Sequence, residues 1–193
     1  MFFSYYSSLF QPELVTPAGE RRSQWYGVSL TPTAFFDGRE QAVQVTHPDS
    51  FWVVYRDQFT GARAHNTVIE LRLDSATTTI DSQQVRIGVQ IHPTDTTVDR
   101  MTNLNLVGIV YEDSVPYYSL LRGDTVYAPL VVRAVIADTW GVPIRLRFGT
   151  DFDTVLTTAV RGWDISHVGV AAFVQDTASQ AVLQAVTRYR LID

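Results

Sequence analysis

A long, mostly apolar β-strand is predicted for the run Leu104-Asn105-Leu106-Val107-Gly108-Ile109-Val110-Tyr111-Glu112-Asp113. The run is rich in β-branched and aromatic residues, which favour extended backbone. It contains fewer polar residues than a strand with one face in water, in which apolar and polar residues would alternate. Glu112 and Asp113 end it.

Further strands are predicted on both sides of this run. Upstream, Glu70, Arg72 and Asp74 alternate with apolar residues, and 85–92 repeats the two-residue period. Downstream strands are expected at 126–136, 144–148, 154–160, 168–174 and 181–189. The turns that separate them are Arg122-Gly123-Asp124, Trp140-Gly141-Val142-Pro143 and Gly149-Thr150-Asp151. Short strands at regular spacing predict a mainly β protein, with an antiparallel β-sandwich of jelly-roll or immunoglobulin-like type over residues 66–193.

The first 65 residues have a different pattern. A short helix is expected at 20–25, a buried strand at 33–36 closed by Asp37-Gly38, and a weaker strand at 43–46. A second helix, capped by Asp49 or Ser50 and ending at Gly61, fits the helical spacing of apolar residues from Phe51 to Phe59. A strand over 51–55 is the alternative.

Composition limits the chemistry. The 193 residues carry a net charge of −5, which argues against a nucleic-acid partner. The absence of cysteine excludes disulfides, Cys-ligated zinc and a thiol nucleophile, and every basic residue is Arg, so Schiff-base chemistry on Lys is excluded. No stretch reaches the roughly 18 apolar residues of a transmembrane helix, so we expect no membrane span. Any export signal would lie upstream of Met1.

Several motifs of the second half occur in an informative order. They are the Glu112-Asp113 strand end, Val131-Val132-Arg133-Ala134, Trp140-Gly141, Val170-Ala171-Ala172-Phe173-Val174-Gln175 and Val182-Leu183-Gln184-Ala185. This order resembles a bacterial outer-membrane lipoprotein family, named after a founding member of roughly 28 kDa, in which a thioredoxin-like domain precedes a β-sandwich. The resemblance spans residues 20–190. It implies a location outside the cell or on the cell envelope surface, and it transfers no catalytic residue.

The start of the chain resembles the end of that first domain. The run Gly27-Val28-Ser29-Leu30-Thr31-Pro32-Thr33-Ala34-Phe35-Phe36-Asp37-Gly38 is similar to the proline loop of a thioredoxin fold. The resemblance implies that residues 1–65 are a partial thioredoxin-like segment and that Pro32 is a candidate cis-proline. With no cysteine beside it, Pro32 is better explained as a turn of the fold than as a substrate clamp. In the family, His-Asn-His often precedes the strand before the Trp-Gly turn, whereas this chain has Tyr127-Ala128-Pro129 there, a departure from the pattern.

Polar residues give only weak catalytic or metal-binding patterns. His47, His65, His92 and His167 show no metal-ligand spacing, and Glu112 and Asp113 point to opposite sides of a strand. Loop acids could bind Ca²⁺ but are better explained as solvated turn residues; they are Asp95, Asp99, Asp138, Asp151 and Asp153. The Arg122-Gly123-Asp124 adhesion tripeptide is better explained as a turn. We therefore expect no enzyme activity, no metal and no cofactor.

Aromatic residues at the N-terminus suggest assembly. The candidate assembly region is Phe2, Phe3, Tyr5, Tyr6, Phe10, Trp25 and Tyr26. These side chains either cover the remnant of the first domain or leave an unpaired sheet edge that binds another chain. The sequence thus predicts a non-catalytic surface module that forms a homo-oligomer or polymer, or contacts other domains of a longer polypeptide. The alternatives are the inactive back half of a thiol oxidoreductase or peptide-binding chaperone, and a sandwich subunit of a filament or shell.

Overall fold

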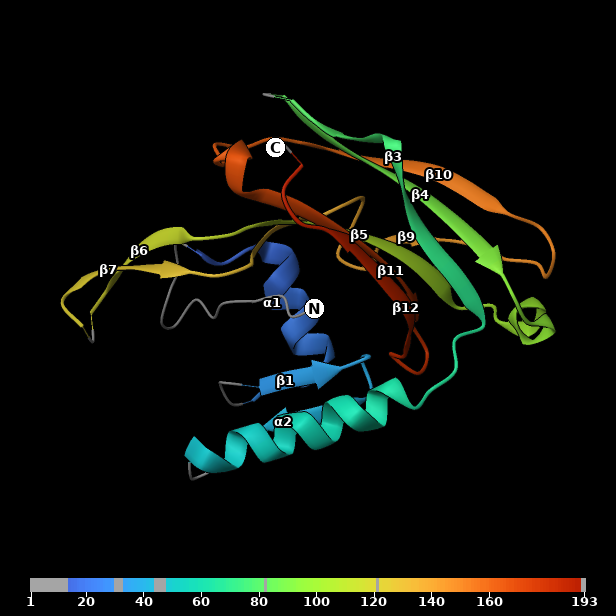
Figure 1. Cartoon of the computed structure of the whole chain (residues 1–193), viewed down its shortest axis with the longest axis horizontal. Coiled ribbons are helices and arrows are strands. Elements are labelled where there is room, and N and C mark those ends of the chain that lie inside the picture. Colours follow the sequence, from blue (N-terminus) through green and yellow to red (C-terminus); the bar gives the residue numbers. More distant parts are fainter. Residues whose placement is uncertain (1–13, 30–32, 44–47, 82, 121, 192–193) are drawn as a thin grey trace.

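Two antiparallel sheets pack face to face in the computed structural model, which describes residues 14–29, 33–43, 48–81, 83–120 and 122–191 (Figure 1). The smaller sheet has the order β10-β4-β3, with β3 Ile69–Ile80, β4 Gln84–Pro93 and β10 Phe152–Ala159. The larger has the order β12-β11-β5-β8, with β5 Leu104–Glu112, β8 Val131–Val135, β11 Val168–Asp176, β12 Val182–Arg188 and the short β9 Val142–Pro143 paired to β5. The predicted mainly β sandwich is confirmed.

Strand β5 lies in the middle of the larger sheet, and both of its faces are buried. Leu104, Leu106 and Val110 point into the core between the two sheets. Val107, Ile109 and Tyr111 point to the opposite face, where they form a second apolar cluster with residues of β8 and β11. Two buried faces explain why the sequence of this strand is apolar without alternation.

Some strand limits differ from the prediction. The expected strand at 126–136 is split into β7 Asp124–Ala128 and β8 by Pro129 and by Leu130, whose φ is +49°. Residues 144–148 form no strand, although Ile144 and Leu146 still bury their side chains in the core. The strand β6 Val115–Ser119 was not predicted, because Pro116 interrupts the run.

The N-terminal part forms a helix, a hairpin and a second helix. They are α1 Pro17–Trp25, β1 Thr33–Phe36, β2 Glu40–Val43 and α2 Pro48–Arg63. Helix α1 begins earlier than expected because Pro17 occupies its first position and Thr16 Oγ1 accepts a hydrogen bond from Gly19 N at 3.1 Å. Strand β2 lies three residues before the predicted 43–46. Helix α2 replaces the alternative strand at 51–55, starts before Asp49 and Ser50, and continues past Gly61.

Helix α1 packs on the outer face of the larger sheet through a buried arginine. The Arg22 side chain donates to Thr139 O at 3.0 Å and to Gln175 Oε1 at 2.8 Å, and its guanidinium lies 5.4 Å from the Phe173 ring. Gln175, also buried, donates in turn to Tyr26 Oη at 2.6 Å. Figure 1 shows α1 between the sandwich and the layer of β1, β2 and α2.

Strands β6 and β7 form a two-stranded hairpin that extends sideways from the sandwich (Figure 1). We call this hairpin, residues 115–128, the arm. Each arm strand pairs with the other. At its base, Val115 and Ala128 bury their side chains with Val131 and with Leu14, the first residue that the structure describes.

Candidate functional site

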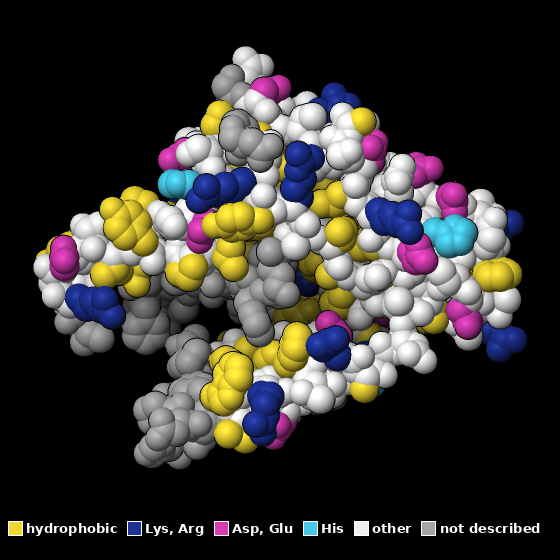
Figure 2. All heavy atoms as spheres, in the orientation of Figure 1, with side chains coloured by type: hydrophobic (Ala, Val, Ile, Leu, Met, Phe, Trp, Pro, Cys, Tyr) yellow, Lys and Arg dark blue, Asp and Glu magenta, His cyan; other side chains and the backbone are white. Residues whose placement is uncertain are grey.

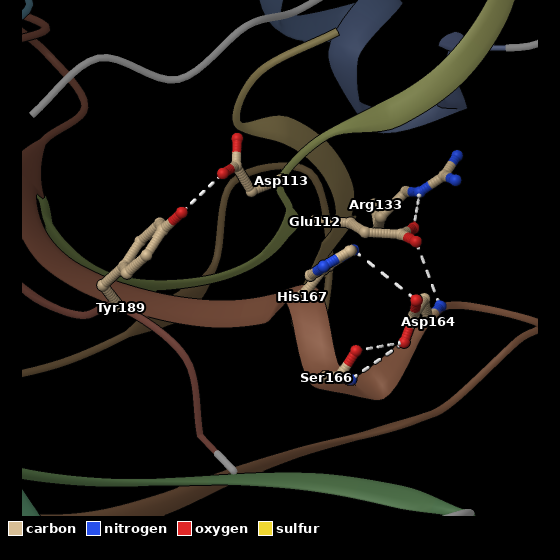
Figure 3. Close-up of polar contacts among 7 residues, drawn as sticks. All are labelled: Glu112, Asp113, Arg133, Asp164, Ser166, His167 and Tyr189. Carbon is tan, nitrogen blue, oxygen red and sulfur yellow. Dashed lines mark hydrogen bonds and ion pairs between the residues drawn. The ribbon is translucent and has the colours of Figure 1, made fainter. Parts of the chain in front are cut away.

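The polar side chains at the carboxyl end of β5 gather in one place (Figure 3). Glu112 is buried, and both of its carboxylate oxygens are engaged. Oε2 accepts from Arg133 Nε at 2.7 Å, and Oε1 accepts from the backbone N–H of Asp164 at 3.0 Å. The carboxylate thus ties β5 to β8 and to the loop before β11.

Asp164 caps the short helix η3 Ile165–His167. Its Oδ1 accepts from the Ser166 hydroxyl at 2.6 Å and from Ser166 N at 3.1 Å, and these bonds lower the pKa of Asp164. His167 Nδ1 lies 3.5 Å from Asp164 Oδ2, a pair that carries opposite charges only when the imidazole is protonated. An ionised, hydrogen-bonded Asp164 is an acceptor and orienting group.

Asp113 has different partners from Glu112. Its Oδ2 accepts from Tyr189 Oη at 2.5 Å, and its Oδ1 accepts from Leu130 N at 3.3 Å. The tyrosine hydrogen bond is the main reason that the pKa of Asp113 is lowered, and the same bond raises the pKa of Tyr189. The contact joins the end of β5 to the segment after β12 (Figure 3).

This bond should make stability depend on acid. Because the folded pKa of Asp113 is lowered, its contribution is present above the usual value of 3.8 and is lost as pH falls below it. Tyr189→Phe removes the donor, so we expect a loss of about 0.5 kcal/mol near neutral pH, small because the bond is exposed, and a shallower decline in acid. Urea unfolding at several pH values measures both effects. The control is Tyr127→Phe on the arm, and equal acid slopes for the three proteins would contradict the assignment.

A cleft of about 430 Å³ lies beside Glu112 at the root of the arm. Its walls include Pro116, Tyr127, Arg133, Asp164 and His167. Each oxygen of Glu112 already accepts a hydrogen bond, one from Arg133 and one from the Asp164 backbone. The arrangement fixes the strands around the cleft and leaves aromatic and imidazole groups at its rim, which suits binding better than acid–base catalysis.

The other polar candidates lie apart from this cleft. His92 Nδ1 contacts Asp151 Oδ1 at 2.5 Å in a shallow cleft of about 260 Å³ on the smaller sheet, where Asp153 also lies. Asp95 caps the short helix η2 Thr96–Arg100, Asp99 accepts from Phe148 N, and Asp138 accepts from Thr139 N. Within the described ranges, no group of three or more His, Asp or Glu side chains could hold a metal ion.

Two residues of the candidate assembly region are described, and both pack within the chain. The Trp25 ring lies 4.9 Å from the Trp140 ring, and the Tyr26 ring lies 4.5 Å from the Phe35 ring. Both are half-buried. Phe2, Phe3, Tyr5, Tyr6, Phe10, His47 and Pro32 lie outside the described residues. The assembly region and the cis-proline therefore stay predictions.

Arg122, Gly123 and Asp124 form the tip of the arm. The backbone N–H groups of Arg122 and Gly123 both donate to Ser119 O, at 3.2 and 2.8 Å, and Gly123 has a φ of +66°. These contacts are those of a tight turn, for which Gly is favoured.

Sequence reasoning missed the exposed apolar residues. Tyr118, Leu120 and Tyr127 of the arm are exposed by 57%, 87% and 67%. Helix α2 exposes Trp52 and Phe59. Figure 2 shows such residues on the arm and on α2, at the margins of the molecule. The signal that could have located the arm is the pair Tyr117-Tyr118 facing Thr125-Val126 across a Gly turn.

Among solved structures, HBP35 of Porphyromonas gingivalis matches 95% of this chain with a TM-score of 0.71 and 15% identity. The chain shares the fold of HBP35. It spans 60% of the length of that protein. The expected resemblance is therefore confirmed at the level of the fold, and it includes the helix–hairpin–helix segment as well as the sandwich.

Two other structures match less well. A domain of the outer membrane lipoprotein Omp28 from Porphyromonas gingivalis aligns with 64% of this chain and 88% of that domain, at 16% identity and a TM-score of 0.44. A beta-glucosidase from Kluyveromyces marxianus aligns with 65% of this chain but 14% of its own, at 12% identity and a TM-score of 0.33. No protein-family model and no curated protein sequence matches the chain.

Proposed function

We propose that this protein is a non-catalytic structural and binding module of the bacterial cell surface or extracellular space. The observation that carries the proposal is the burial and hydrogen bonding of the Glu112 carboxylate. This carboxylate is buried and bonded on both oxygens to Arg133 and to the Asp164 backbone, so the most enclosed acid of the candidate site stabilises the sheet. The neighbouring arm, in contrast, presents large apolar side chains to solvent.

The location rests on resemblance. The shared fold with HBP35 and the order of motifs in the second half both support a protein of the outer-membrane lipoprotein type. Among the residues that the structure describes, no helix is long and apolar enough to cross a bilayer. On the resemblance, we propose a location outside the cell or on the envelope surface.

The N-terminal part supports a link to a thioredoxin-like fold. Strands β1 and β2 form a hairpin directly after the predicted proline loop, and α2 packs on it through Phe36, Ala42 and Ala62. A hairpin followed by a helix is what the resemblance implies for the end of such a domain. This observation favours the alternative in which the chain is the inactive back part of a thiol oxidoreductase or peptide-binding chaperone.

We further propose that the module self-associates through its N-terminal region. In light scattering, the 193-residue chain should have a mass above that of one copy, and a chain lacking residues 1–10 should have the mass of one copy. The physical reason is that removing these aromatic side chains removes apolar area that could drive association.

A length-matched variant separates the loss of aromatic residues from the loss of chain. It carries serine at Phe2, Phe3, Tyr5, Tyr6 and Phe10 and should behave like the deletion. A single-copy mass for the intact chain, unchanged by either variant, would exclude self-association. Regular particles in negative stain would favour the filament or shell alternative.

A further inference from the structure

The arm is a hairpin that needs support beyond its own hydrogen bonds. Its five residue pairs run from Val115 with Ala128 to Ser119 with Asp124, and within the described part of the chain β6 and β7 pair with no further strand. An isolated two-stranded hairpin is marginally stable in water. The arm of this protein nevertheless extends away from the sandwich (Figure 1).

The two faces of the arm differ. Because side chains alternate along a strand, Val115, Tyr117 and Val126 share one face with Ala128, whereas Tyr118 and Tyr127 lie on the other. On the first face Val115 and Ala128 are buried, and Tyr117 and Val126 are half-buried. We call it the Leu14 face, since Leu14 packs there.

The position of Leu14 fixes the point at which residues 1–13 join the described part of the chain. Its side chain is 3% exposed and packs against Val115, Ala128 and Val131, with Tyr117 at the edge of the cluster. Residues 1–13 are therefore joined to the rest of the chain at the base of the arm. At about 3.3 Å per residue they can extend about 43 Å, while the five pairs of the arm extend roughly 17 Å.

The composition of this segment suits an apolar face. Residues 1–12 contain no Asp, Glu, Lys or Arg, and six of them are Phe2, Phe3, Tyr5, Tyr6, Leu9 and Phe10. Aromatic residues favour extended backbone and bury large apolar areas. An extended segment could also add its backbone to the edge of the hairpin.

We propose that the N-terminal segment, residues 2–10, binds along the Leu14 face of the arm and completes it as a layered structure. The occupant is the same segment whether it comes from the same copy or from a neighbour, since an exchanged segment makes the same contacts. Exchange between copies would give the self-association proposed above, and in that respect the inference rests on the proposed function.

Disulfide trapping tests whether residues 2–10 lie on the Leu14 face. Because the chain has no cysteine, only the introduced cysteines can form a disulfide. We pair Ser7→Cys or Ser8→Cys with Val126→Cys on the Leu14 face. The matched control pairs the same two changes with Thr125→Cys, the adjacent and exposed position on the opposite face. A disulfide requires Cα atoms roughly 4.4–6.8 Å apart, so only a segment seated on the Leu14 face should cross-link efficiently to position 126.

The outcomes separate the two proposals. A disulfide at position 126 and not at 125 supports the placement. If it forms within one copy, self-association by exchange fails while the placement stands; if it links two copies, both stand. Equal yields at 125 and 126, or no cross-link in any pair, overturn the placement even if light scattering still shows an oligomer.

Proteolysis gives a second readout on chains without added cysteine. Deleting residues 1–10 should increase the rate of tryptic cleavage after Arg122, at the arm tip, by about tenfold, because an uncovered hairpin opens more often. Cleavage after Arg86 in β4 should change little. Unchanged cleavage at Arg122 in the deletion would contradict a supporting role of the segment.

Discussion

Replacing Gly141 with alanine is expected to lower the free energy of unfolding by about 4 kcal/mol, the scale of a backbone strain combined with a steric clash. Gly141 has a φ of +80°, and a Cβ there would lie only 2.3 Å from the carbonyl oxygen of Leu106. The atom it meets belongs to the backbone of β5, which cannot rotate away. The turn must therefore move, and the pairing of Val142 with Leu106 should be lost with it.

Gly149→Ala is the matched control for this prediction. Gly149 also has a positive φ, +71°, but a Cβ there would meet nothing within 4 Å. Its cost should be about 1–2 kcal/mol, from the left-handed conformation alone. Urea unfolding of both variants isolates the clash as the difference between them. Equal losses would show that the turn at Gly141 yields without disturbing β5.

Replacing Glu112 with glutamine should cost about 3 kcal/mol, as expected when one partner of a buried ion pair is removed. Glutamine has the same shape, but its one carbonyl oxygen cannot serve both Arg133 Nε and Asp164 N, so its amide nitrogen must face a donor. Arg133 is also left without its counter-charge. Glu70→Gln is the control, since the Glu70–Arg72 pair is exposed and should be worth less than about 1 kcal/mol.

A double-mutant cycle tests the origin of this loss. If Glu112→Gln destabilises mainly by leaving the Arg133 charge unpaired, adding Arg133→Met should recover part of the stability. Additive losses in urea unfolding would instead assign the effect to the hydrogen bond at Asp164 N. A loss for Glu112→Gln no larger than that for Glu70→Gln would contradict the anchoring role given to Glu112.

The sandwich could be predicted from sequence because most of its strands show clear alternation or apolar runs. Alternation marked β3 and β4, and the apolar run at 104–112 marked β5, whose side chains are buried on both faces of the sheet. The same local reasoning expected the first helix at 20–25, whereas it begins at Pro17, which at the first helical position needs no hydrogen-bond donor. It also merged β7 with β8, since one apolar run does not reveal a residue with positive φ such as Leu130.

The candidate site was harder to predict because its partners are distant in sequence. Glu112 and Asp113 were noticed as adjacent acids, but Arg133, Asp164 and Tyr189 meet them only through the pairing of β5 with β8 and β11. Nothing in one sequence states that pairing. The buried Arg22 was missed for the same reason: its acceptors, Thr139 O and Gln175 Oε1, come from the far end of the chain.

The sheet order β12-β11-β5-β8 has a consequence for how the chain acquires its fold. The central strand β5 is joined on one side by β11, which follows it by more than fifty residues, so its neighbour arrives late in synthesis. Until β11 is available, the apolar faces of β5 have no complete partner. Such non-local pairing predicts slow folding, on the scale of about milliseconds to seconds.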